Sequence, residues 1–334
     1  MRATTQQSLV PAESFWSWAQ ADGSDLSVAW RHAGHDVSPA ESARSLPSVV
    51  LVHGFGASSG HWRHALPVLG GRANTYALDL IGFGASSQPQ ALLAGESDPD
   101  QPPLRSSALH YGFDLWGQQV ADFCQQVVQG PVLLVGNSIG GVVALRAAQL
   151  LEQHCRGVVL IDCAQRLMDD KQLATQPAWM AWIRPLLKTL VSQRWLSTAL
   201  FRNAARPRVI RSVLGQAYPS GANIDDALVE LLYQPTQRSG AAEAFRGFIN
   251  LFDDHLAPDL LETLEQPVHL IWGERDPWEP VAEARAWANR FSCIQSLRVL
   301  PKVGHCPHDE APEPVNTRLL ELLESMGDAK SLSR

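Results

Sequence analysis

A serine in a glycine-rich turn is the residue best placed to do chemistry in this sequence. Ser138 lies in the G-x-S-x-G pattern Gly136-Asn137-Ser138-Ile139-Gly140, between an apolar, β-branched run and a stretch with helical spacing. A sharp turn between a strand and a helix holds the hydroxyl clear of the sheet, where a base can reach it. The amide of Ile139 would begin the helix, where negative charge is favoured, so we expect it to stabilise an oxyanion.

A serine hydroxyl is a weak nucleophile without a base, and two histidines follow the last predicted strand. In KVGHCPHDE, His305 comes directly after a glycine, in a position from which its imidazole can reach the nucleophile. His308 precedes two acidic residues and a predicted helix start, so we expect it to cap the helix or to pair at the surface. His305 is therefore the predicted base.

The imidazole in turn needs an acid that fixes its tautomer and stabilises its cation. Asp276, in WGERDPWEP, follows the penultimate predicted strand and is the preferred candidate. Asp162, at the end of the fourth core strand, is the alternative, because its side chain could reach the same region. If Asp162 is not the acid, we expect it to cap a backbone amide at the end of its strand.

The second oxyanion donor is expected in the loop after the first core strand. His53-Gly54-Phe55-Gly56 is such a loop, and the amide of Phe55 is the predicted donor. The side chain of Phe55 would help to wall the pocket, and His53 is expected to hold the loop with its ring. Asn137, beside the nucleophile, and two tryptophans further along, Trp179 and Trp182, are further candidates for the substrate pocket.

Alternating strand and helix patterns supply the elements that must hold these residues. Short alternation over 15–34 predicts one or two antiparallel strands. Buried parallel strands are predicted around 49–52, before Leu80, and over 132–135, 157–162, 267–273 and 296–300, with helices over 115–128, 139–151, 280–291 and 312–323. This alternation predicts an α/β fold with a mostly parallel sheet flanked by helices.

The alternation breaks in the middle of the chain. From Gln165 to about Pro258 only helical runs occur. We therefore predict one core made of residues 1–164 and 259–334, interrupted by a helical cap at 165–258. One interrupted core explains the 334 residues better than two tandem domains.

Composition excludes several classes of protein. Hydrophobic residues make up 45% and charged residues 18%, which is typical of a globular enzyme. A net charge of −7 argues against a general nucleic-acid binder, which would rely on Lys and Arg. The five cysteines form no paired motif and indicate a reducing compartment. With no run of 18 apolar residues and no apolar leader in the first twenty, we expect a cytoplasmic protein without a signal peptide.

Along nearly its whole length the chain resembles the α/β-hydrolase superfamily, and within it the pheophytinase and chlorophyll dephytylase group. The similar segments are HGFGASSGHW, GFGASSQP, GNSIGGVVAL and the most specific one, GHCPHDEAPEPVN. The resemblance implies a serine hydrolase that cleaves the phytyl ester of a chlorophyll-type pigment. It implies Ser138 as nucleophile, His305 as base and Asp276, in GERDP, as acid, with no metal or organic cofactor.

Other functions stay open at this stage. The same triad serves carboxylesterases and lipases for other hydrophobic esters, as well as carbon–carbon bond hydrolases, and a non-catalytic binding module is the alternative from another class. Haloalkane dehalogenases and epoxide hydrolases of this fold use aspartate where this chain has Ser138. No oligomeric state is predicted.

The predicted cap carries an excess of positive charge. Between 165 and 211 there are nine Lys or Arg against two Asp, interleaved with Trp, Met, Ile and Leu. Such a pattern suits a helix lying on an anionic membrane, for example a thylakoid, which a phytyl ester hydrolase would have to reach. The alternative is a lid whose apolar side packs on the core and whose cations, such as Arg184, Lys188 and Arg194, are simply solvated.

Overall fold

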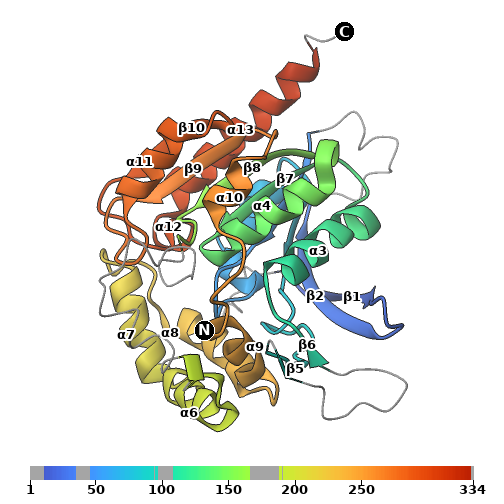
Figure 1. Cartoon of the computed structure of the whole chain (residues 1–334). Coiled ribbons are helices and arrows are strands. Elements are labelled where there is room, and N and C mark those ends of the chain that lie inside the picture. The colour runs from blue at the N-terminus through green and yellow to red at the C-terminus, as the bar shows by residue number, and fades with distance from the viewer. Residues whose placement is uncertain are drawn as a thin grey trace, which may run out of the picture.

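Eight strands form one sheet at the centre of the protein, in the order β1-β2-β4-β3-β7-β8-β9-β10 (Figure 1). The computed structural model describes residues 11–34, 46–93, 95–96, 108–165, 188–189 and 191–331. β1 (Glu13–Ala19) and β2 (Asp25–Ala33) pair antiparallel, as predicted, and β2 also pairs antiparallel with β4. The six remaining strands are parallel: β3 (Ser48–Val52), β4 (Thr75–Leu78), β7 (Val132–Asn137), β8 (Cys155–Ile161), β9 (Val268–Gly273) and β10 (Ile294–Leu300).

Helices cover both faces of this sheet, which confirms the predicted fold class. One face carries α3 (Phe113–Phe123), which continues as a π-helical turn at Cys124–Val128, with α4 (Ile139–Leu151), α10 (Ala257–Leu261) and α11 (Val281–Arg290). The other face carries α2 (Leu66–Gly70) and α13 (Pro312–Ser331). Short helical turns lie at η1 (Ser59–Trp62), η3 (Glu152–His154) and α12 (Pro307–Glu310), and β5 (Gln90–Ala91) pairs with β6 (Ala108–Leu109) in a small second sheet.

Alternate side chains of the central strands divide between two apolar cores. In β3, Val50 and Val52 point into the core under α3 and α4, whereas Val49 and Leu51 point into the core under α2 and α13. All four are fully buried. A strand buried on both faces has to be apolar at every position, which explains the continuous β-branched runs in the sequence.

The segment between β8 and β9 contains helices and no strand in its described part. Besides α10, which packs on the sheet, they include α6 (Arg194–Ala204), α7 (Pro207–Ala217), α8 (Asp226–Tyr233), η5 (Gln234–Gln237) and α9 (Ala241–Ile249). Figure 1 shows α6, α7, α8 and α9 gathered at one end of the molecule. The boundaries of a cap at 165–258 stay a prediction. Among the described residues, no helix is both long and apolar enough to span a bilayer.

Candidate active site

Ser138 occupies a strained turn between β7 and α4. Its backbone angles are φ 55° and ψ −124°, a conformation that a residue with a side chain rarely adopts. A Cβ at Gly136 would lie 2.1 Å from the carbonyl oxygen of Gly140, and one at Gly140 would lie 2.4 Å from that of Val52. The two glycines of the G-x-S-x-G pattern are therefore required by packing. At these positions β7, α4 and the end of β3 approach each other too closely to leave room for a Cβ.

His305 and Asp276 are hydrogen-bonded to each other. Nδ1 of His305 lies 2.7 Å from Oδ2 of Asp276, and both side chains are buried or nearly so. The other carboxylate oxygen, Oδ1, accepts from the amides of Trp278 at 2.8 Å and Glu279 at 3.1 Å. Burial alone would raise the pKa of Asp276, but the hydrogen bond and positive charge of His305 outweigh it and hold that pKa below its usual value. The acid is thus ionised and fixes the ring of His305 with Nδ1 as donor.

Asn137 joins the nucleophile turn to the histidine loop. Its Nδ2 donates to the carbonyl of His305 at 3.0 Å and to that of Ile161 at 3.1 Å. The residue before Ser138 is therefore bonded directly to the residue predicted as base. Both amide hydrogens of Asn137 are used in this way, so any contact with substrate must come from its Oδ1. Trp179 and Trp182 lie outside the described residues.

The loop after β3 lies against the nucleophile. A Cβ on Gly54 would be 3.2 Å from the Cβ of Ser138. Phe55 follows in this loop, and Ile139 is the first residue of α4. Within the described part of the chain, the amides of these two residues donate to no protein acceptor. Two free N–H groups beside a nucleophile are what an oxyanion hole requires.

His53 holds this loop, as the sequence predicted. Its Nε2 accepts from the amide of Leu80 at 3.0 Å, so Nδ1 carries the hydrogen and donates to the carbonyl of Gly54 at 2.7 Å. Burial lowers the pKa of His53. The ring is therefore a neutral structural bridge between two backbone groups.

Two further carboxyl groups lie behind Asp276. Asp162 is fully buried, accepts from the amide of Gly273 at 2.9 Å and hydrogen-bonds to Asp276. Burial, and after it the neighbouring charge of Asp276, raise the pKa of Asp162 well above its usual range. Asp162 therefore stays protonated and donates a hydrogen bond to Asp276. Burial also raises the pKa of Glu279 to about 8. Asp162 therefore caps a backbone amide, as the alternative expectation held, whereas Asp276 is the carboxylate that contacts His305.

One oxygen or nitrogen atom from each of Asp162, Asp276 and His305 lies within 4.8 Å of the others, as in a metal site. The hydrogen bonds among these three groups and to the amide of Gly273 account for this arrangement without a metal.

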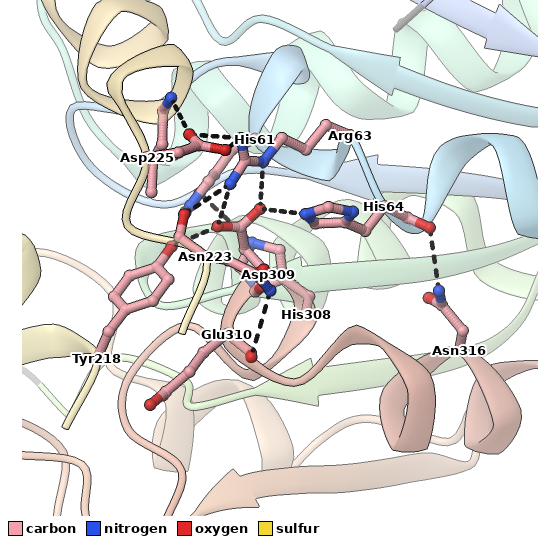
Figure 2. Close-up of polar contacts among 11 residues, drawn as sticks. His61, Arg63, His64, Tyr218, Asn223, Asp225, His308, Asp309, Glu310 and Asn316 are labelled. Atoms are coloured by element: carbon pink, nitrogen blue, oxygen red, sulfur yellow. Dashed lines mark hydrogen bonds and ion pairs between the residues drawn. The ribbon is translucent and has the colours of Figure 1, made fainter. Parts of the chain in front are cut away.

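Figure 2 shows a polar network to which His308 belongs. The prediction of a surface or capping role for His308 is wrong. Its side chain is fully buried, its ring lies 4.3 Å from that of Trp62, and its Nε2 lies 3.4 Å from Nδ1 of His61. Burial lowers the pKa of His308 well below its usual value and that of His61 to about 4, so both rings are neutral.

A directed chain of hydrogen bonds leads from these histidines to Asp309. The hydroxyl of Tyr218 donates to Oδ2 of Asp309 at 3.0 Å, so Nε2 of His61, 2.8 Å from the same hydroxyl, must be a donor. Arg63 binds Asp309 from the other side, at 2.8 Å, and also binds Asp225 at 3.0 Å (Figure 2). The network joins the core residues 61–63 and 308–309 to the segment 218–225.

Glu310 connects that segment to the loop of His305. One oxygen accepts from the amide of Gly304 at 2.6 Å, and the other accepts from the amide of Ser220 at 2.9 Å. The amide of His305 itself donates to the carbonyl of Ala217 at 2.9 Å. The sequence did not identify Glu310, Ser220 and Ala217 as residues that position this loop, although GHCPHDEAPEPVN is longer than the supply of a base requires.

A narrow aromatic slot of about 50 Å³ adjoins Phe55. Its walls include Phe83 from the core and two phenylalanines from the helices between β8 and β9, Phe201 and Phe245. Phe55 is 36% exposed and stacks on Phe248 with ring centroids 4.2 Å apart. The slot can accept a small apolar group beside Phe55.

Comparisons with known proteins identify the family and the fold. Residues 49–318 match the alpha/beta hydrolase family. The chain is 24% identical to the chloroplastic pheophytinase of Arabidopsis thaliana over 291 residues, covering 81% of this chain but only 60% of that protein. It is 22% identical to 2-hydroxy-6-oxo-6-(2'-aminophenyl)hexa-2,4-dienoic acid hydrolase of Metapseudomonas resinovorans, covering 86% of this chain and 87% of that one. A thermophilic esterase from Thermogutta terrifontis shares the fold, with a TM-score of 0.65, 20% identity, and 95% and 99% of the two chains covered.

Proposed function

Because this chain belongs to the alpha/beta hydrolase family, we propose that it is a serine hydrolase that cleaves a carboxylic ester through Ser138, His305 and Asp276. The observation that carries the proposal is the 2.7 Å hydrogen bond between His305 and Asp276, at a histidine whose carbonyl is bound by the neighbour of Ser138. A serine in a strained turn and an oriented imidazole are the two parts that acyl transfer needs.

In the first half of the reaction, Oγ of Ser138 forms a bond to the ester carbonyl carbon while Nε2 of His305 takes the hydroxyl proton. Asp276 stays ionised and stabilises the imidazolium through Nδ1. The negative charge that develops on the carbonyl oxygen is bound by the amides of Phe55 and Ile139. When the carbon–oxygen bond breaks, the imidazolium gives its proton to the departing alcohol, leaving an acyl group on Ser138.

In the second half, a water molecule replaces the alcohol. His305 takes its proton as the water oxygen bonds to the acyl carbon; when the bond from that carbon to Oγ breaks, the imidazolium returns the proton to Oγ, which gives the free acid and the Ser138 hydroxyl. The same two amides hold the second oxyanion. Each amide contributes a factor of about 10²–10³ in turnover on the scale of known oxyanion donors.

The substrate class that we propose is a long, apolar ester, in particular the phytyl ester of chlorophyll or pheophytin. Two things support it: the resemblance in GHCPHDEAPEPVN and the 24% identity with a pheophytinase. The slot walled by Phe55, Phe83, Phe201 and Phe245 has a volume of about 50 Å³, so it can bury only a short part of such a chain.

The test offers the purified protein pheophytin a, chlorophyll a and p-nitrophenyl esters of increasing chain length, with Ser138→Ala as the control. We expect release of phytol from a pigment ester and no release by Ser138→Ala. Cleavage of short acyl esters only would refute the pigment assignment and leave the serine mechanism in place. Absence of any Ser138-dependent ester cleavage, with activity on a vinylogous 1,5-diketone instead, would identify a carbon–carbon bond hydrolase.

A further inference from the structure

The outer face of α6 exposes large apolar side chains, which is unusual for a helix at the surface. Trp195 is 71% exposed and Leu200 is 46% exposed. On the neighbouring helix, α7, Val213 is 43% exposed. Phe201, the residue after Leu200, lines the aromatic slot. The helix that exposes Trp195 and Leu200 therefore also borders the slot.

Three arginines line a cavity of about 370 Å³ beside this face, between α6, the start of α7 and η5. They are Arg202, Arg206 and Arg238, and no acidic residue lines the cavity with them. Arg238 is anchored, because its Nη1 donates to the carbonyls of Gly84 at 2.7 Å and Ser86 at 2.6 Å. In the part of the chain that the structure describes, Arg202 and Arg206 form no ion pair.

Unpaired guanidinium groups that converge on one cavity favour an oxyanion with several acceptor oxygens, such as a phosphate. In a chain with a net charge of −7, such a cluster is not a general property of the surface. Trp195 and Leu200 on the same helix add the amphipathic and apolar groups that lie at the boundary between lipid headgroups and acyl chains.

We propose that the face formed by Trp195, Leu200, Arg202 and Arg206 docks on a bilayer containing anionic phospholipid, with a lipid phosphate in the arginine-lined cavity. The arginine charge complements the lipid phosphates, and the exposed apolar side chains enter the interface. Docking would place the helix that borders the slot at the lipid surface. The inference rests on the proposed function, because a phytyl ester is too apolar to diffuse through water and is met at a lipid surface.

The structure limits which basic residues can take part. Arg194 is not among them, because it is paired with Glu243 and its Nη2 donates to the carbonyl of Ala91 at 3.2 Å. Arg211 is paired with Asp226. Arg184 lies outside the described residues. Removing Arg194 would therefore disturb contacts within the protein, whereas Arg202 and Arg206 can be changed without breaking an ion pair.

The test is flotation of the full chain with two kinds of vesicle: phosphatidylcholine alone, and three parts phosphatidylcholine to one part phosphatidylglycerol. We expect binding to the anionic vesicles only, and its loss in about 1 M salt, where screening acts within about 3 Å. The variant Arg202→Gln/Arg206→Gln should bind roughly 30-fold more weakly, about fivefold for each arginine removed. Trp195→Ser should weaken binding without abolishing its dependence on salt.

The matched control is Arg285→Gln/Arg298→Gln, which removes the same charge from exposed positions on α11 and β10. Figure 1 shows these elements at the other end of the molecule from α6 and α7. Equal binding to neutral vesicles, full binding by Arg202→Gln/Arg206→Gln, or equal loss in the control pair would overturn the proposal. Ser138-dependent cleavage of a water-soluble p-nitrophenyl ester is measured on every variant, so failure of docking and failure of the proposed function are told apart.

Discussion

Arg63 holds two carboxylates that differ in burial, and this difference predicts a large asymmetry in their contribution to stability. The side chain of Asp309 is 0% exposed, whereas that of Asp225 is 55% exposed. Removing one partner of a buried ion pair costs about 3–5 kcal/mol, because a charge is left in a low-dielectric site. An exposed pair contributes about 0–1 kcal/mol. We therefore expect Arg63→Ala to lower the free energy of unfolding by roughly 3 kcal/mol, at the lower end because Tyr218 still donates to Asp309.

Asp225→Asn isolates the exposed pair. Oδ1 of Asp225 caps α8 by accepting from the amide of Leu228 at 2.7 Å, and asparagine caps a helix about as well as aspartate. The loss should therefore stay below about 1 kcal/mol. In the Arg63→Ala background, Asp309→Asn should restore part of the lost stability, because it removes the buried charge that Arg63→Ala leaves unpaired.

The free energy of unfolding is measured by urea unfolding at neutral pH, followed by tryptophan fluorescence. The four proteins compared are the wild type, Arg63→Ala, Asp225→Asn and Arg63→Ala/Asp309→Asn. Equal, small losses for Arg63→Ala and Asp225→Asn would show that the buried pair is no stronger than the exposed one. If adding Asp309→Asn to Arg63→Ala lowers the free energy of unfolding further, the unpaired carboxylate of Asp309 is not itself destabilising. Either result would refute the claim that the buried Arg63–Asp309 ion pair contributes most of the stability that Arg63 provides.

Substitutions at three further residues test the site. Asp276→Asn should lower kcat by roughly 10⁴ with little change in the far-UV circular dichroism, because His305 loses the partner that fixes its tautomer; a change below tenfold would identify another acid. Asp162→Asn, which can still donate to Asp276, should keep kcat/KM within a few-fold of the wild type while Asp162→Leu lowers it far more, and equal losses in steady-state kinetics would show that the donated hydrogen bond is unimportant. Glu279 has an ordinary pKa of 4.5 and a folded-state pKa of about 8. Between these two pH values the carboxyl group is protonated in the folded protein and ionised in the unfolded chain. The contribution of Glu279 to stability should consequently fall as pH rises from about 5 to about 8, by up to ~1.4 kcal/mol per pH unit, so the urea midpoint of the wild type should decrease relative to that of Glu279→Gln over this range; identical slopes would mean that Glu279 is ionised in the fold.

The sheet was predictable because buried strands leave local marks, and the turns that carry the candidate site residues were recognisable from their neighbours. Each buried strand is a short run of apolar residues, and Ser138 and Asp276 lie in turns directly after such runs. The amide-capping role of Asp162 was also foreseeable, since it ends a strand. What burial does to that carboxyl group was not, because it depends on the approach of Asp276 from a loop 114 positions later in the chain.

The buried network escaped prediction for the same physical reason. Arg63 and Asp309 are separated by 246 positions, and Tyr218 reaches them from a helical segment with no distinctive pattern. His308 illustrates the difficulty: next to two acidic residues it has the local pattern of a surface residue, yet those acids are buried with it because their partners come from elsewhere. A local pattern gives the chemistry of a side chain, and tertiary packing decides its exposure.

The length of the motif around His305 now has a physical explanation. Only the histidine would touch a substrate, but Glu310 binds Gly304 on one side and Ser220 on the other, and the amide of His305 binds Ala217. The loop that carries the base is therefore built partly from the segment that follows α7. Because these bonds are directional and buried, displacement of that segment would also displace His305. The hydrogen bonds of Glu310 and of the His305 amide therefore make the position of His305 depend on residues 217–220.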